Sequence, residues 1–60
     1  MKHEKIELFV QPPNRPEERR LIAQVEPNIP NYDAVYMTGV PLDRVLAIRR
    51  TKQRMIVVVT

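Results

Sequence analysis

Apolar and polar side chains alternate near the beginning of the chain. Ile6, Leu8 and Val10 are each separated by one residue, so a strand would place all three on the same face. Phe9 adds an apolar side chain to the opposite face, and a pair of prolines follows, which ends the run because proline donates no backbone hydrogen bond. The pattern predicts a β-strand over residues 6–11.

Residues 14–17, Asn-Arg-Pro-Glu, have the composition of a helix start. They offer an asparagine cap, a proline in the first turn and a glutamate three residues after the cap. In the helix that would follow, Leu21, Ile22 and Val25 would lie on one face. Leu21, Ala23 and Val25 also alternate, so a strand is the competing interpretation. We expect a helix that ends at the next proline.

Two further segments are rich in β-forming residues. Residues 34–38, Ala-Val-Tyr-Met-Thr, predict a short strand, and residues 55–60, Met-Ile-Val-Val-Val-Thr, predict a longer one. Gly39 is the single glycine of the chain. We interpret it as a turn residue with a positive φ rather than as part of a ligand site.

Residues 41–52 fit two interpretations. They begin with a proline that suits a first helical turn, and their apolar side chains have helical spacing, at Leu42, Val45 and Leu46. We therefore expect a helix. The alternative is a strand over residues 44–50 that turns at residues 51–53, although that turn lacks the Gly, Asn or Asp typical of hairpins.

Together these elements predict an α+β fold. It would form one domain over residues 1–60, with a three-stranded sheet and two short helices in the order β-α-β-α-β. Right-handed connections would place both helices on one face of the sheet and leave the other face open. The last strand is apolar on both faces, so we expect a homo-oligomer in which a second subunit covers the open face. A five-stranded small barrel, an all-β fold, is the alternative.

The small size limits the chemistry of the chain. Sixty residues support one small core, and domains of this size commonly add disulfides, a metal or a partner. The chain has no cysteine and one histidine, His3, so we expect no disulfide, no metal site and no cofactor.

No apolar run approaches the length of a membrane span, and the N-terminus lacks the apolar stretch of a signal peptide. We expect a cytoplasmic protein that does not bind membranes.

The net positive charge comes from the second half of the chain. Residues 1–30 contain five Lys/Arg and five Glu, whereas residues 31–60 contain five Lys/Arg and two Asp, which accounts for the net charge of +3. These five cations are Arg44, Arg49, Arg50, Lys52 and Arg54. Arginine can bind phosphate in bidentate geometry, and a solvated surface is the neutral alternative. We predict that these residues bind nucleic acid or an acidic protein partner.

Side chains suited to catalysis are few. The chain has no serine and no cysteine, and one glycine is too few for a phosphate-binding loop. We therefore expect a non-catalytic oligomeric binding module. The alternative is a structural or interaction subunit of a protein complex, whose C-terminal strand docks into the sheet of another chain.

Two segments resemble the 4-oxalocrotonate tautomerase family. Residues 6–22 resemble its opening strand and helix, and residues 39–48, Gly-Val-Pro-Leu-Asp-Arg-Val-Leu-Ala-Ile, resemble the start of its second strand. The resemblance covers about half of the chain and implies a small oligomeric enzyme. The catalytic proline of that family follows the initiator Met, where this chain has Lys2, and Pro27 and Pro30 fall where the family has continuous helix. The implied alternative is a divergent tautomerase-like enzyme without the N-terminal proline.

Overall fold

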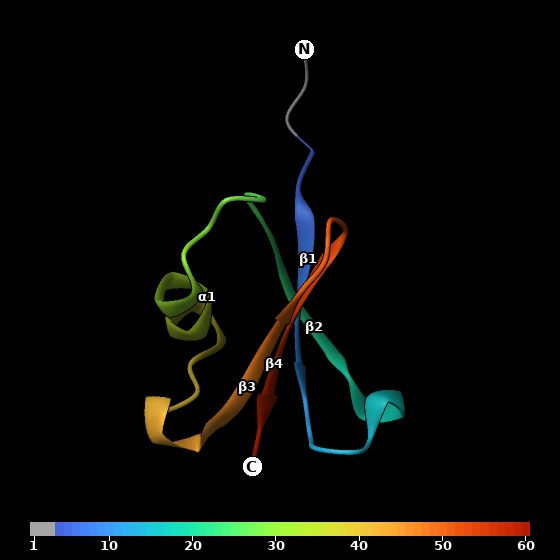
Figure 1. Cartoon of the computed structure of the whole chain (residues 1–60), viewed down its shortest axis with the longest axis vertical. Coiled ribbons are helices and arrows are strands. Elements are labelled where there is room, and N and C mark those ends of the chain that lie inside the picture. Colours follow the sequence, from blue (N-terminus) through green and yellow to red (C-terminus); the bar gives the residue numbers. More distant parts are fainter. Residues whose placement is uncertain (1–3) are drawn as a thin grey trace.

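Within residues 4–60, four strands form one twisted sheet, and one α-helix packs against it (Figure 1). The computed structural model describes residues 4–60, so Lys2 and His3 lie outside the described part. The elements in chain order are β1 (Ile6–Gln11), β2 (Arg20–Val25), α1 (Asn31–Thr38), β3 (Val45–Arg50) and β4 (Arg54–Val59). Two 3-10 turns, η1 (Pro16–Glu18) and η2 (Leu42–Arg44), precede β2 and β3.

The sheet consists of two hairpins that meet side by side. The strand order is β2-β1-β4-β3, in which β1 pairs with β2 and β3 pairs with β4 in antiparallel fashion. The two central strands, β1 and β4, are parallel. Each edge strand contains one extra residue, Ile22 in β2 and Leu46 in β3, where the pairing register shifts. Such bulges increase the local twist of a strand.

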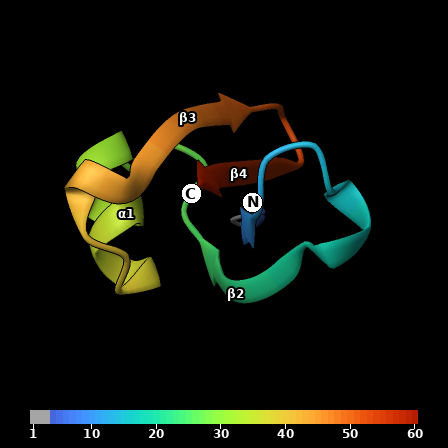
Figure 2. The ribbon, with the colours of Figure 1, turned by 90° about the horizontal axis from the view of Figure 1, so that it is seen from below.

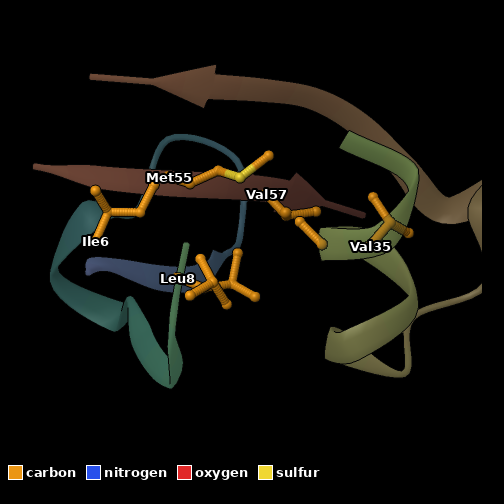
Figure 3. Packing of buried hydrophobic residues seen from close by; sticks show 7 residues of the cluster. Ile6, Leu8, Val35, Met55 and Val57 are labelled. Carbon is orange, nitrogen blue, oxygen red and sulfur yellow. The ribbon is translucent and has the colours of Figure 1, made fainter. Parts of the chain in front are cut away.

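The hydrophobic core lies between α1 and one face of the sheet. Alternation along the strands brings one set of apolar side chains to this face, and α1 adds Ala34 and Val35, the second of which is labelled in Figure 3. Leu8, Met55 and Val57 are fully buried at its centre. The whole cluster consists of Ile6, Leu8, Val25, Ala34, Val35, Met55 and Val57.

The central position of β4 explains how its apolar side chains are buried on both faces. Met55 and Val57 face the core, whereas Ile56 and Val58 point to the face that α1 does not cover. Ile56 and Val58 are nevertheless each only 8% exposed in the single chain. Other parts of the same chain therefore shield these side chains without a second subunit. The last strand therefore does not need a second subunit to bury its apolar side chains, which was our reason to expect a homo-oligomer. The oligomeric state stays a prediction.

The predicted helix after the first strand is wrong, and residues 20–25 form β2. The capping box does not form: Asn14 has a φ of 61°, and Arg15 occupies the N-cap of η1 without a side-chain cap. Only the three residues of η1 are helical, with Pro16 at the first position. The competing strand interpretation is correct because β2 pairs directly with the preceding strand, which leaves Leu21 53% exposed and buries Val25. The helix implied by the tautomerase resemblance is also absent here.

The predicted strand over residues 34–38 is wrong as well, because these residues belong to α1. The helix begins after Pro30 and buries Ala34 and Val35, while Tyr32 and Tyr36 point to solvent. Gly39 ends it with a φ of 75°, and its N–H donates to the Tyr36 carbonyl at 3.1 Å, which confirms the positive φ expected of this glycine. Burial of Ala34 and Val35 against the sheet outweighs the β-propensity of this segment.

Residues 41–52 do not form the expected helix, and residues 45–50 of this segment form the strand β3. Helical structure is limited to η2, and β3 follows it directly. The turn to β4 is built on a threonine: the Thr51 hydroxyl accepts hydrogen bonds from the N–H groups of Gln53 and Arg54 at 3.2 and 3.1 Å. This side chain replaces the Asn or Gly that residues 51–53 lack, as in other hydroxyl-based turns.

The expected fold class is therefore corrected. A four-stranded mixed sheet with one α-helix and two 3-10 turns replaces the three-stranded sheet with two helices, and the five-stranded barrel is not formed either. The strand predicted over residues 6–11 is present with the same bounds, and the last strand begins one residue earlier than expected. No helix within residues 4–60 combines the length and apolar character that a membrane span requires.

Candidate binding face

The sheet presents one face that α1 does not cover, which we call the open face. Figure 2 shows α1 on one side of the sheet and the segment that contains η1 on the other. The register of the strands assigns alternate residues to this face. They are Glu7, Phe9 and Gln11 of β1, Leu21 and Gln24 of β2, Ala47 and Arg49 of β3, and Arg54, Ile56 and Val58 of β4.

The open face has an apolar centre and charged margins. One row across the four strands consists of Leu21, Phe9, Ile56 and Arg49. The next row towards the β3–β4 turn consists of Gln24, Glu7 and Arg54. Arg49 is exposed and Arg54 is half-buried. Long arginine side chains can cover apolar surface with their stems and still present the guanidinium group to solvent.

A third arginine, Arg19, reaches the centre of this face from the segment before β2. Its guanidinium carbon lies over the Phe9 ring, 5.4 Å from the ring centroid, which is within the range of a cation–π contact. The backbone at Arg19 is held by a hydrogen bond from its N–H to the Pro16 carbonyl at 3.1 Å. The Arg19 Nε is buried and has no hydrogen-bond partner among the described residues.

The arginines of the open face have no acidic partner within residues 4–60. The ion pairs of this part of the chain join Lys5 to Glu26 at 3.9 Å and Arg15 to Glu18 at 3.0 Å. Neither pair includes an open-face arginine, and Glu7 is the one acid among the residues assigned to that face. The positive charge on the open face is therefore available to an external anion.

The structure brings together only part of the predicted basic set. Arg49 and Arg54 share the open face, and Lys52 lies in the turn that joins their strands. Arg44 lies in η2 at the opposite end of β3, about 20 Å from that turn for a six-residue strand. Arg50 points to the same face as Met55, which is the face that α1 covers.

Arg50 makes structural contacts with the segment around the start of α1. Its Nη1 donates to the Asn31 Oδ1 at 2.9 Å, and its Nη2 donates to the Pro27 carbonyl at 2.9 Å. One guanidinium group thus joins the end of β3 to the loop before α1 and to the first residue of the helix. These two bonds use donors that would otherwise be available to a phosphate.

Replacing Arg50 with glutamine should destabilise the fold rather than weaken binding. Loss of the two hydrogen bonds is expected to lower the free energy of unfolding by about 1 kcal/mol, because both bonds are exposed. Urea unfolding followed by circular dichroism measures this loss. Arg49→Gln is the matched control, since the Arg49 side chain is exposed on the other face, and an equal loss in both variants would contradict the structural role of Arg50.

Sequence reasoning missed Arg19 as a member of the site. The charge of residues 1–30 sums to zero, so a count along the chain gives no reason to select one of its cations. The pairing of β1 with β2 is what brings Arg19 to Phe9. The observed register pairs Phe9 with Leu21, so Arg19, two residues before Leu21, lies on the same face as the Phe9 ring.

The structure thus combines a four-stranded mixed sheet, one face of which is buried under a helix, with a second face that is basic and open. The described residues enclose no pocket and gather no group of three or more metal-ligating side chains. Comparisons with protein-family models, with curated proteins and with solved structures find no match for this chain.

Proposed function

We propose that this chain is a non-catalytic binding module that contacts nucleic acid through its open face. The observation that carries the proposal is the placement of Arg19, Arg49 and Arg54 around an apolar centre, with no acidic side chain paired to any of them within residues 4–60. Guanidinium groups bind phosphate oxygens in bidentate geometry, and each neutralised phosphate releases bound counterions. Such a face favours a polyanion over a neutral ligand.

A second candidate is an interaction subunit of a protein complex, and the two edge strands favour it. Each of β2 and β3 has a sheet partner on one side only, so its other edge offers unpaired backbone groups to an added strand. The C-terminal strand β4 is paired on both sides. A strand that docks into another sheet would therefore be β2 or β3 rather than the C-terminal strand that we expected.

The nucleic-acid proposal predicts binding that depends on where the charge lies rather than on its total. A fluorescently labelled oligonucleotide is titrated with the full chain by fluorescence anisotropy over a series of salt concentrations. We expect the affinity to fall with a linear log–log slope, as counterion release requires. In the variant Arg49→Gln/Arg54→Gln, we expect affinity to fall about tenfold or more and the slope to decrease by about 2.

The control variant is Arg20→Gln/Arg44→Gln, which removes the same charge. Arg20 lies opposite Val10 on the other face, and Arg44 lies in η2. We expect this variant to retain most of the affinity. Equal losses in the two double variants would mean that net charge alone drives binding, and absence of salt-sensitive binding by the unmodified chain would refute the proposal.

A further inference from the structure

We propose that the open face selects single-stranded over double-stranded nucleic acid, because Arg19 and Phe9 form a platform on which one unpaired base stacks. This inference rests on the proposed function and specifies its ligand. It predicts that one arginine of the face acts through its planar shape, whereas the others act through their charge.

The first argument is the arrangement of Arg19 itself. Its guanidinium group lies over the aromatic ring at the centre of the face, and its backbone is fixed by the turn before β2. Phe9 lies between β2 and β4 in the sheet, next to Ile56, so the ring has apolar support. Unpaired bases stack on arginine guanidinium planes as well as on aromatic rings, whereas a paired base has both of its faces occupied by neighbours.

The second argument is the spacing of the other two arginines from this platform. Arg49 is in the same row as Phe9 but two strands away, which corresponds to about 10 Å. Arg54 is on the strand next to β1 and two residues from Ile56, about 7 Å along the strand direction. Both cations are therefore close enough to contact phosphates next to a base that stacks on Arg19.

The third argument is the width of the sheet. The major groove of a DNA duplex is about 12 Å wide and accepts an α-helix or a two-stranded ribbon. Four strands span about 14 Å between the axes of the outer two, before side chains are added. The open face is therefore too wide to enter that groove, whereas a flexible single strand can lie across it.

The experiment separates the shape of Arg19 from its charge. The full chain is titrated with a labelled oligothymidine and with a duplex of equal length, under the same salt conditions. Arg19→Lys keeps the positive charge but removes the planar group, and Arg20→Lys makes the same change at the neighbouring residue on the other face. Phe9→Leu keeps an apolar side chain but removes the ring beneath Arg19.

We expect the unmodified chain to bind the single strand more tightly than the duplex. Arg19→Lys should weaken single-strand binding about tenfold, because base stacking is worth that order of affinity, and should weaken duplex binding far less, because the positive charge is kept. Phe9→Leu should also weaken single-strand binding. Arg20→Lys should change neither the single-strand affinity nor the duplex affinity.

The result that overturns this inference differs from the one that overturns the proposed function. Equal affinity for single strand and duplex, or an equal effect of Arg19→Lys on both, would remove the stacking platform and leave a general phosphate-binding face. Absence of salt-sensitive binding to either probe would remove the proposed function together with the inference.

Discussion

Replacing Leu8 with alanine is expected to lower the free energy of unfolding by about 3 kcal/mol. Leu8 is fully buried on the central strand β1, between the side chains of β2 and β4 and beneath α1. A single core in a chain of this size supplies only about 3–5 kcal/mol. The variant should therefore keep only about 0–2 kcal/mol of stability, which urea titration followed by circular dichroism would show as a much lower unfolding midpoint.

Two further variants keep this prediction testable. Leu8→Met nearly conserves side-chain volume and should cost less than about 1.5 kcal/mol, so its free energy remains measurable even where the alanine variant does not fold. Leu46→Ala removes a side chain that is 57% exposed on the edge strand and should change stability by no more than about 0.5 kcal/mol. Similar losses at positions 8 and 46 would contradict the location of the core.

Replacing Ile56 with alanine is expected to cost about 2–4 kcal/mol, although this residue points away from the helix. Its side chain is 8% exposed in the single chain, so the cavity would form within one molecule. The loss should be the same over a tenfold range of protein concentration, on the order of what urea titrations allow, because no association step contributes to it.

The dependence on protein concentration also tests the homo-oligomer that we expected from the sequence. If a second subunit covered Ile56, the unfolding midpoint of the unmodified chain would rise with protein concentration, and light scattering would report a mass above that of one chain. Ile56→Val, which should cost about 1 kcal/mol, provides a folded reference in either case. A loss on Ile56→Ala that changes with protein concentration would show that a second subunit contributes to the burial of this side chain.

The elements that the sequence predicts correctly are those with strong local patterns. The first strand is defined by alternation and by the prolines after it, and the last strand by its run of β-branched residues.

The middle of the chain is ambiguous because its decisive interactions are between segments. Leu21 and Val25 fit a helix or a strand equally well until β1 is present as a pairing partner. Ala34 and Val35 become buried because residues 31–38 form a short helix that packs against the sheet.

The candidate site could be predicted only in part for a related reason. Clustering along the chain indicates Arg49 and Arg54, which lie on neighbouring strands and share a face. The same clustering adds Arg50, whose side chain points to the other face and bonds to Asn31, because adjacent residues of a strand alternate between faces. If residues 45–50 had been predicted as a strand, Arg49 and Arg50 would have been assigned to opposite faces, but we expected a helix there.

The parallel pairing of β1 with β4 has a consequence for how the domain folds. Each hairpin involves residues close in sequence, whereas the register that joins the hairpins pairs Leu8 with Met55. Contacts between residues so far apart in sequence close a large loop, and the chain loses this entropy before favourable core contacts form. Such contacts also raise the contact order of the chain. We expect the docking of the two hairpins to limit the folding rate. During synthesis, the core side chains of β1 therefore remain without their parallel partner strand until residues 54–59 have left the ribosome.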